Sequence, residues 1–379
     1  MERRRRTPRT DWVSKVEEVG LIYHHTQDQP YWDESAYYAF TAKEIDTLDA
    51  ATNELQRVYL EAAQHVIDRK RYAELGIPPQ AIPMIEWSWN NEPPAIYGRF
   101  DLAWDGTGAP KLLEYNADTP TALLEASVVQ WYWLKDVSPN ADQFNSIHER
   151  LVKKWRELQP YLTGSPLYFT HLDDQMGEDL MTATYQRDIA EEAGLSTAGV
   201  LIKDIGWDHD ARRFVDDVGH PIRSIFKLYP WEWMVHEAFG PQLLVTYPEM
   251  QWIEPIWKML FANKGMLAIL WDLFPGHPNL LKAHLGAPDG MTEYARKPLL
   301  SREGANVTLV TRAGTTATAG DYGEEGFVYQ ALAPIPVLDG RRPVLGTWVI
   351  DGEAAGLGIR ESDGPITDNR SRFVPHLFT

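Results

Sequence analysis

Hydrophobic residues between positions 41 and 70 recur at intervals of three and four, the spacing that places them on one face of a helix. Thr41 and Glu44 have the spacing of a capping box, in which each side chain bonds the other residue's backbone N–H. The pattern therefore predicts a helix over residues 41–70. Its apolar stripe consists of Leu48, Ala51, Leu55, Tyr59, Ala62 and Val66. Similar patterns predict helices over residues 121–135, over residues 142–158, and in an apolar segment that opens near Lys264.

Between residues 97 and 116 the pattern changes to strand, turn and strand. YGRFDLAW and KLLEYN flank the turn-rich DGTGAP, which predicts a β-hairpin. Alternate residues of a strand share a face. One face of the first strand then carries Arg99, Asp101 and Ala103, and the other, which resembles a core face, carries Phe100, Leu102 and Trp104. On the second strand, Leu112, Glu114 and Asn116 are expected to share a face, with Leu113 and Tyr115 opposite.

The residue pattern in the middle of the chain predicts a βαβ unit. PLYFTHL and STAGVLI have the character of strands, and the helical segment between them ends at Gly194. SIFKLY predicts another strand, and the chain beyond residue 295 is mostly strand-like, in RKPL, NVTLVT, FVYQAL, PVLGTWVI and GLGIR. This order of elements predicts an α+β or mixed α/β fold.

Composition narrows the functional classes. The 379 residues are 44% hydrophobic, and the formal charge of −18 opposes general binding to nucleic acid. The basic run at residues 3–6 fits either a solvated segment or a nucleic-acid arm. It has no apolar stretch behind it and is not a signal peptide. No run of about 18 apolar residues predicts a transmembrane helix. The absence of cysteine excludes disulfides, zinc–thiolate sites and thiol nucleophiles, and we expect a cytoplasmic protein.

Common nucleotide and hydrolase fingerprints are missing. The chain has neither a P-loop nor a G-x-G-x-x-G turn between a strand and a helix. It has no H-E-x-x-H zinc helix and no G-x-S-x-G elbow. A nucleotide would therefore have to bind in another way.

The polar face of the predicted hairpin is the strongest chemical feature. Arg99, Asp101, Glu114 and Asn116 can converge on one side of the ribbon. Two carboxylates and an amide oxygen are hard ligands that suit Mg²⁺, and Arg99 can face phosphates as a donor fork. From the pattern alone, a surface hairpin whose polar face meets water is the favoured interpretation of these residues.

Several separated blocks resemble the glutathionylspermidine synthase family. They are YGRFDLAWDGTGAPKLLEYNADTPTALLEA, EPIWKMLFANKGMLAILWDLFPGHPNLL, YARKPLLSREGANV, FVYQAL and GLGIRES. They occur in the family's order and extend, with gaps, from about residue 11 to the end of the chain. The resemblance implies a stand-alone synthetase-like unit over residues 1–379 with an ATP-grasp fold and a βαβ-containing pre-ATP-grasp region. We expect a substrate subdomain over residues 160–255 and an ATP-grasp portion over 256–379, completed by the 97–116 hairpin.

The resemblance also implies roles for individual residues. Asp101, Glu114 and Asn116 match magnesium ligands, while Arg99 and Arg360 match catalytic arginines that contact phosphate or stabilise the transferring phosphoryl group. The matches to ATP-contacting residues are Arg99, Lys264, Lys297, Ser301, Gly304, Gln330, Ala331 and Leu332. The matches to substrate-contacting residues are Thr119, Thr121, Glu178 and Asp179. Leu228 departs from the family, which has a glutathione-contacting threonine there, so the sequence does not specify glutathione.

The implied activity is ATP- and Mg²⁺-dependent formation of an amide bond. A small peptide or other carboxylate would be activated as an acyl phosphate and then attacked by a polyamine or amino acid. A loop over residues 301–306 could exclude water from that intermediate. Two alternatives on the same scaffold are a non-catalytic nucleotide- or peptide-binding protein and a phosphotransferase.

Overall fold

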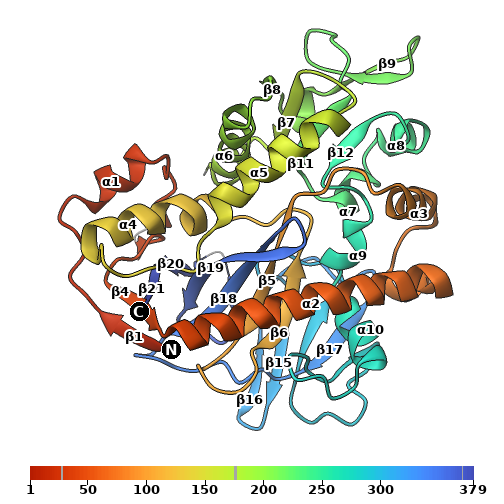
Figure 1. Cartoon of the computed structure of the whole chain (residues 1–379). Helices are drawn as coiled ribbons and strands as arrows, with labels where there is room; N and C mark the ends of the chain where they lie inside the picture. The colour runs from red at the N-terminus through yellow and green to blue at the C-terminus, as the bar shows by residue number, and fades with distance from the viewer. Residues whose placement is uncertain (27–28, 175–176, 369) are drawn as a thin grey trace.

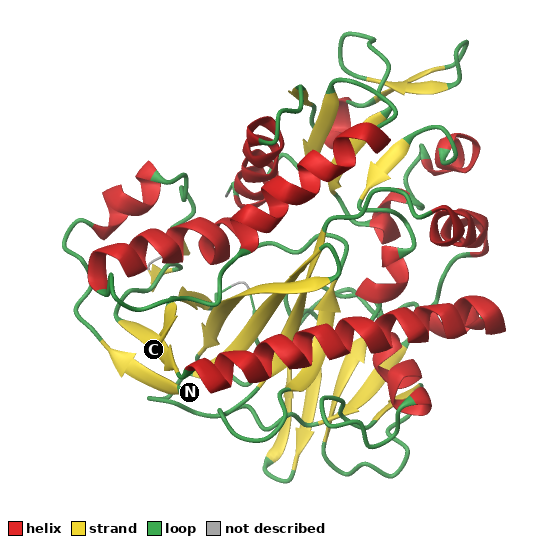
Figure 2. Ribbon diagram, in the orientation of Figure 1, coloured by secondary structure: helices red, strands yellow, loops and turns green. Residues whose placement is uncertain are grey.

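The computed structural model describes residues 1–26, 29–174, 177–368 and 370–379. Helices and strands are mixed along the chain, and the strands gather in the interior with helices packed against them (Figures 1 and 2). The mixed α/β class expected from the sequence is confirmed. Within the described residues, no helix combines the length and the apolar character needed to cross a membrane.

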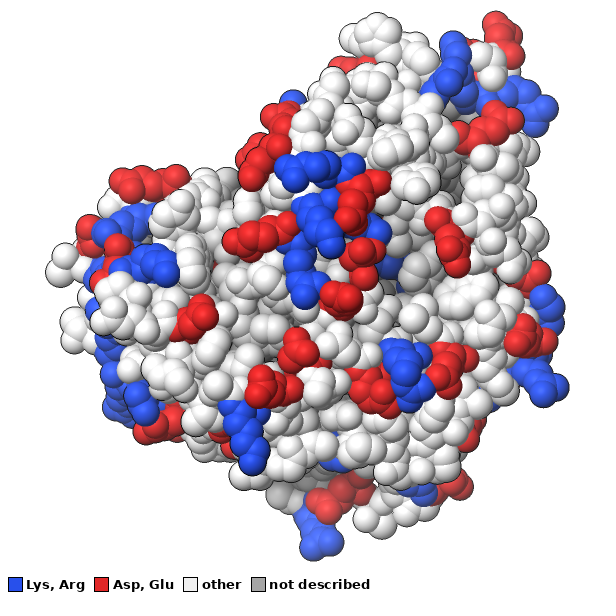
Figure 3. All heavy atoms as spheres, viewed as in Figure 1, with Lys and Arg blue, Asp and Glu red and all other residues white. Residues whose placement is uncertain are grey.

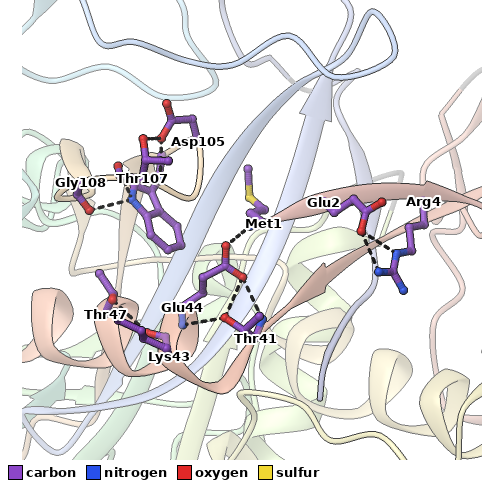
Figure 4. A network of polar contacts seen from close by, with 11 residues as sticks. Met1, Glu2, Arg4, Thr41, Lys43, Glu44, Thr47, Asp105, Thr107 and Gly108 are labelled. Carbon is purple, nitrogen blue, oxygen red and sulfur yellow. Dashed lines mark hydrogen bonds and ion pairs between the residues drawn. The ribbon is translucent and has the colours of Figure 1, made fainter.

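The predicted first long helix is confirmed as α2, Ala42–Arg69. Thr41 and Glu44 form the capping box, in which the Thr41 N–H donates to Glu44 Oε2 at 2.8 Å and Glu44 N–H donates to Thr41 Oγ1 at 3.3 Å. The Met1 amino group also contacts the Glu44 carboxylate, as Figure 4 shows. Helix α2 packs its apolar stripe against two strands of the central sheet, across whose face it runs in Figure 1.

The central sheet contains the predicted hairpin. Its strand order is β20–β19–β18–β5–β6, and its pairs are antiparallel. The bounds are β5 Tyr97–Ala103, β6 Lys111–Asn116, β18 Arg342–Ile350, β19 Glu353–Ser362 and β20 Arg372–Val374. The hairpin places Arg99 opposite Asn116 and Asp101 opposite Glu114. Every residue of β5 is buried, so the interpretation as a water-facing surface hairpin is wrong.

One part of the predicted alternation is also wrong. A β-bulge follows the Asp101–Glu114 pair, so that Leu102 pairs with Leu112 and not with Leu113. A bulge inserts one extra residue in one strand and reverses the faces beyond it. Leu112 therefore packs in the core and does not share the face of Glu114, while Leu113 lines the polar side.

A second antiparallel sheet faces the first with strand order β13–β17–β14–β15–β16. Its bounds are β13 Ala283–Leu285, β14 Tyr294–Pro298, β15 Thr308–Thr311, β16 Gly314–Ala317 and β17 Phe327–Ala331. Helix α9, Lys258–Ala262, and helix α10, Met266–Leu273, connect this sheet to the rest of the chain. Lys264 lies just before α10, where the sequence predicts the helix to open.

The predicted βαβ unit is confirmed in a third, parallel sheet with order β12–β11–β7–β8. Helix α6, Glu178–Glu192, connects β7 to β8, and helix α5, Ile147–Leu158, packs on α6. The strand bounds are β7 Leu167–His171, β8 Thr197–Gly199, β11 Ser224–Leu228 and β12 Gln251–Ile253.

Smaller elements complete the fold. The strand β4, Ala36–Phe40, lies between β1, Glu2–Arg5, and β21, His376–Phe378. The remaining strands are β2 His25–Thr26, β3 Gln29–Pro30, β9 Gly206–Asp208 and β10 Arg213–Val215. The remaining helices are α1 Trp12–Glu18, α3 Ile82–Asn91, α4 Gln130–Val137, α7 Trp231–Met234, α8 Gly240–Thr246, a π-helical turn Glu125–Val129, and 3₁₀ turns Arg71–Leu75, Pro79–Ala81, Gln159–Tyr161 and Ile202–Asp204.

The basic run has a structural role that neither sequence interpretation foresaw. Arg3 is paired with the fully buried carboxylate of Glu361 at 2.6 Å, and Tyr38 donates to the same carboxylate at 2.5 Å. Arg4 and Arg5 are exposed and pair with nearby acids. On the face drawn in Figure 3, basic and acidic side chains are interspersed.

Two predicted helices begin later than their patterns suggest. In the segment predicted over 121–135, Ala122 has a φ of +63°, which is not a helical angle. The π-helical turn and α4 follow it. The helix predicted over 142–158 begins at Ile147, because the preceding backbone is bonded to other segments. Asp142 N–H donates to Phe378 O at 3.1 Å, and Ser146 N–H donates to Ala355 O at 2.7 Å.

A buried ion pair joins the parallel sheet to the central sheet. Glu254, just after β12, accepts the N–H groups of Ile96 and Tyr97 at 2.9 and 3.3 Å. Lys258 contacts both the Glu254 carboxylate and the Tyr97 carbonyl. Because both charged groups are buried, neither can lose its partner without leaving an uncompensated charge.

Replacing Lys258 with Met should lower the free energy of unfolding by about 3–5 kcal/mol, because Glu254 would stay buried without its cation. Urea denaturation of the variant and the wild-type chain measures this difference. Lys153→Met is the matched control, since its side chain is 72% exposed, and it should change stability by about 0.5 kcal/mol or less. Equal stability of the two variants would contradict the assigned role of the pair.

His376 in β21 should make the fold sensitive to acid. Its Nε2 accepts the Phe144 N–H at 3.2 Å, its Nδ1 lies 2.8 Å from Gln130 Oε1, and burial lowers its pKa to about 3. Between pH 6.5 and 3 the unfolded chain binds the proton that the folded chain rejects, so stability falls as the pH falls through this window.

From pH 7 to pH 5 this histidine alone should cost about 2 kcal/mol of stability. Urea denaturation at both pH values, compared with His376→Gln, isolates its contribution from that of the carboxylates. A pH dependence that is identical in the two proteins would refute the assignment.

Candidate active site

The two antiparallel sheets and the start of α6 enclose a cavity of about 400 Å³. All the site residues selected from the sequence line this one cavity, although they are spread over more than 260 positions. They are Arg99, Asp101, Glu114, Asn116, Thr119, Thr121, Glu178, Asp179, Lys264, Lys297, Ser301, Gly304, Gln330, Ala331, Leu332 and Arg360. The tertiary structure therefore brings the whole predicted set together, while the role of each residue stays a prediction.

The carboxylate of Asp101 lies at the centre of a hydrogen-bonded group on the central sheet. Arg99 binds it as a fork, with Nε at 2.8 Å from Oδ1 and Nη2 at 3.2 Å from Oδ2. Arg360, from β19 on the far side of β18, donates to Asp101 Oδ2 at 2.8 Å, and the Asn116 amide donates to it at 3.2 Å. Asp101 is only 2% exposed, so these donors stabilise a charge that burial would otherwise disfavour.

Glu114 is the second carboxylate of this floor. Lys264 Nζ lies 3.0 Å from Glu114 Oε2 and donates to the Ser301 carbonyl at 2.6 Å. Burial acts to raise the pKa of Glu114, but Lys264, Lys297 and Arg360 outweigh it and lower the pKa to about 2. Glu114 is therefore ionised at neutral pH and can act as an oxygen ligand.

Lys297 and Gln330 join the second sheet to the hairpin. Lys297 Nζ donates to Gln330 Oε1 at 2.7 Å and to the Leu113 carbonyl at 2.9 Å. Gln330 Nε2 donates to the Leu112 carbonyl at 2.9 Å, so the bulge supplies both acceptors on β6. Burial lowers the pKa of Lys297 to about 8, with Glu114 opposing the change and Lys264 adding to it. Ala331 and Leu332 continue the cavity wall beyond Gln330.

The opposite end of the cavity is acidic. Glu178 and Asp179 belong to the first turn of α6, whose N–H groups are held by Asp174 Oδ2 at 2.7 and 3.4 Å. Burial raises the pKa of Asp179 to about 7, Arg302 opposes this, and Glu178 adds to it. Glu232 and Glu303 line the same end, and burial also raises the pKa of each.

The loop from Ser301 to Asn306 closes one side of the cavity. Glu303, Gly304 and Asn306 have positive φ angles, and a Cβ on Gly304 would lie 2.5 Å from the Thr367 carbonyl oxygen. Only glycine fits so close to that backbone. The hydroxyl of Ser301 lacks a hydrogen-bond partner among the described residues, although it is buried at the cavity wall.

Arg302 was not among the residues selected from the sequence. Its Nη1 donates to Thr119 Oγ1 at 2.7 Å, and its guanidinium lies 5.6 Å from the centroid of the Trp233 ring. Arg302 lies between Ser301 and Gly304 in the loop expected to exclude water, and this position was the signal that could have identified it. Tyr23 and Tyr31 also line the cavity, but their segment carries no motif that could have identified them.

Asp118 is another residue that the sequence did not single out. It lines the cavity two positions after Asn116, and its Oδ1 accepts from the fully buried Lys227 at 2.6 Å. Its Oδ2 accepts the Trp231 N–H at 2.9 Å. This pair ties β11 to the end of the hairpin. Leu228, the next residue of β11, packs in the core, and it is not among the described residues that line the cavity.

The geometry divides the cavity into two electrostatic halves. Arg99, Lys264, Lys297 and Arg360 surround the two carboxylates of the hairpin floor, an arrangement in which cations outnumber anions. The other half has Glu178, Asp179, Glu232 and Glu303 around the guanidinium of Arg302. An anionic ligand is favoured at the first end and a cationic ligand at the second.

Comparisons with known proteins agree with this arrangement. Residues 3–379 match the family model described as glutathionylspermidine synthase preATP-grasp. A protein of Haemophilus influenzae named putative acid–amine ligase is 38% identical over 98% of this chain and 97% of its own length. The bifunctional glutathionylspermidine synthetase/amidase of Escherichia coli is 27% identical over 96% of this chain, which spans 63% of that protein.

Among solved structures, a glutathione synthetase-like effector from Globodera pallida in its apo form has a TM-score of 0.57. It is 11% identical, and the match covers 99% of this chain and 98% of that one. This likeness shows a shared fold, in agreement with the ATP-grasp-like architecture expected from the sequence. With the family match over nearly all its residues, the chain belongs to the glutathionylspermidine synthase family.

Proposed function

We propose that the chain uses Mg-ATP to join the carboxylate of a small peptide, such as a glutathione-like molecule, to a polyamine or an amino acid. Membership in this family makes it an ATP-dependent amide-forming ligase, and the proposal names its cofactor, its residues and its substrate classes. The observation that carries the proposal is the polarised cavity, with excess positive charge at the hairpin floor and excess negative charge at α6. A nucleotide phosphate suits the first end, and an amine suits the second.

The residues at the floor fit a magnesium ion. Asp101 and Glu114 present carboxylate oxygens from paired positions of the hairpin, and the amide oxygen of Asn116 is a third hard ligand. Mg²⁺ prefers such oxygens and usually keeps phosphate and water as its other ligands. An ion held by these three residues would supply positive charge that neutralises the developing charge during phosphoryl transfer.

The cationic side chains would act on the phosphates. Arg99 and Arg360 already converge on Asp101, so a phosphoryl group at the floor meets two guanidinium groups. Lys297 approaches from β14 of the second sheet, and Lys264 approaches from the segment before α10. Phosphoryl transfer depends mainly on positioning and charge stabilisation, which these residues supply without a protein nucleophile.

Formation of the amide requires a dry site and an amine that has lost its proton. The Ser301–Asn306 loop borders the cavity and would exclude water from an acyl phosphate. Asp179, whose pKa is raised to about 7, can attract an ammonium group when ionised and accept its proton near neutral pH. Thr119 and Thr121 would contact the acid substrate from the cavity wall.

Replacing Asp101 with Asn or Glu114 with Gln should reduce amine-dependent ADP release by about 100-fold or more, because each removes a charged ligand from the phosphate site. The assay uses Mg-ATP with a panel of γ-glutamyl and other small peptides, each with and without polyamines or amino acids. Asp46→Asn, on the exposed face of α2, is the matched control and should keep full activity. ADP release that needs no amine would contradict the ligase proposal and favour a phosphotransferase.

Lys297→Ala should raise the KM for ATP by about tenfold, since it removes a cation and one of the two hydrogen bonds that hold Gln330 on the cavity wall. Steady-state kinetics with varied ATP measures the change. Lys43→Ala removes an exposed lysine from the start of α2 and should leave the KM unchanged. An unaltered KM in Lys297→Ala would exclude this lysine from ATP binding.

A further inference from the structure

Tyr31 forms an isolated polar contact at the wall of the cavity. Its hydroxyl donates to Glu125 Oε1 at 2.7 Å, and both residues are almost fully buried. Glu125 opens the π-helical turn Glu125–Val129, and Tyr31 lies just after the β2–β3 pair. None of the activity described above uses this pair.

The hydrogen bond decides what Tyr31 can offer to a ligand. A tyrosine hydroxyl has one proton, and here that proton is given to Glu125. Towards the cavity its oxygen can then only accept a hydrogen bond. A ligand at this position must bring a donor, and a substrate carboxylate, which has only acceptors, is excluded from it.

The surroundings of Tyr31 add a preference for positive charge. Tyr23 packs beside it with ring centroids 4.9 Å apart, and both rings line the cavity. Burial and the nearby charges of Glu125 and Glu178 raise the pKa of Tyr31, so its hydroxyl stays neutral. Aromatic faces beside carboxylates favour a cationic amine over a neutral or anionic group.

The position also suits the proposed reaction. Tyr31 lines the same cavity as Glu178 of its acidic end and Arg360 of the floor where phosphate is expected. An amine held there would share the cavity with an acyl group activated at Arg99 and Arg360.

The π-helical turn is held in place by contacts on its other side. Ala122, at a φ of +63°, precedes the turn, and Arg99 Nη1 donates to the neighbouring Thr121 carbonyl at 2.6 Å. Ser127 shares a hydrogen bond of 2.6 Å with Tyr185. The same arginine that binds Asp101 therefore fixes the chain that leads to Glu125.

We propose that Tyr31, with its proton held by Glu125, binds the N–H of the amine substrate and selects an alkylamine at this end of the cavity. The inference rests on the proposed ligase function, and it adds a residue pair and assigns the amine to one wall. The acid substrate then takes the side of Thr119 and Thr121.

The test compares two nucleophiles in the same enzyme. Hydroxylamine, small and neutral, traps an acyl phosphate as a hydroxamate without needing a cation site. Spermidine, 1,4-diaminobutane, lysine and glycine serve as amine probes, with glutathione, γ-glutamylcysteine and glycylglycine as acids. The variants are Tyr31→Phe and Glu125→Gln, and Tyr185→Phe is the control, because it removes a buried hydroxyl bonded to the same turn. Thermal unfolding verifies that each variant is folded.

Tyr31→Phe should raise the KM of the productive amine by about tenfold, the effect of one charge-assisted hydrogen bond, while hydroxamate formation changes less than twofold. Glu125→Gln should raise the same KM less, because its carbonyl still accepts the tyrosine proton although the charge is lost. Tyr185→Phe should change neither quantity.

The inference would be overturned if Tyr31→Phe had an amine KM within twofold of the wild-type value. It would also be overturned if hydroxamate formation fell by the same factor as the reaction with the amine. Should Tyr31→Phe fail to fold, Glu125→Gln decides by the same two measurements. If the wild-type chain forms no hydroxamate with any of the acids, the ligase proposal itself is wrong. That result differs from one in which the wild-type chain forms hydroxamate and only the role of Tyr31 and Glu125 is refuted.

Discussion

Two carboxylates on one hairpin, Asp101 fully and Glu114 partly buried, set the constraint on which the rest of the site depends. Asp101 and Glu114 are directly opposite each other and point into the protein, where an uncompensated charge is strongly disfavoured. Their compensation comes from far along the chain: Arg360 on β19, Lys264 before α10, and Lys297 on β14. The two antiparallel sheets therefore have to face each other across this floor. The same requirement explains why positive charge accumulates where phosphate is expected.

A second constraint fixes the acidic half of the cavity relative to the first. Lys227 on β11 reaches Asp118, two residues beyond the last residue of β6, and Glu254 after β12 holds the start of β5. Both contacts lie at the carboxyl ends of parallel strands, the usual edge for ligand sites in such sheets. They connect the sheet that carries α6 to the hairpin, and Asp118 also lines the cavity. The acidic first turn of α6 thereby faces the cationic floor across a space that an acid, an amine and a nucleotide could share.

Much of the local structure was readable from residue patterns. The capping box and stripe predicted α2 to within one residue at each end, and alternation along β5 separated Arg99 and Asp101 from the apolar Phe100 and Leu102. Alternation failed at Leu112, because a bulge follows Asp101 and no local signal marks an inserted residue. The starts of α5 and α4 were misplaced for a related reason. Their first residues bond to strands and to Arg99, partners that lie far away in the sequence.

The sequence by itself determined the mixed α/β class, the hairpin with its polar face, and, through separated blocks in a family order, the set of residues around one cavity. These features depend on local periodicity and on residue identity, which a chain carries without being folded. Only the tertiary structure decided that the hairpin is buried, that Arg302 bonds Thr119, and that the proton of Tyr31 belongs to Glu125. The two hydrogen bonds join residues more than 90 positions apart, and such pairings, like the burial of the hairpin, arise from tertiary packing that no local pattern encodes.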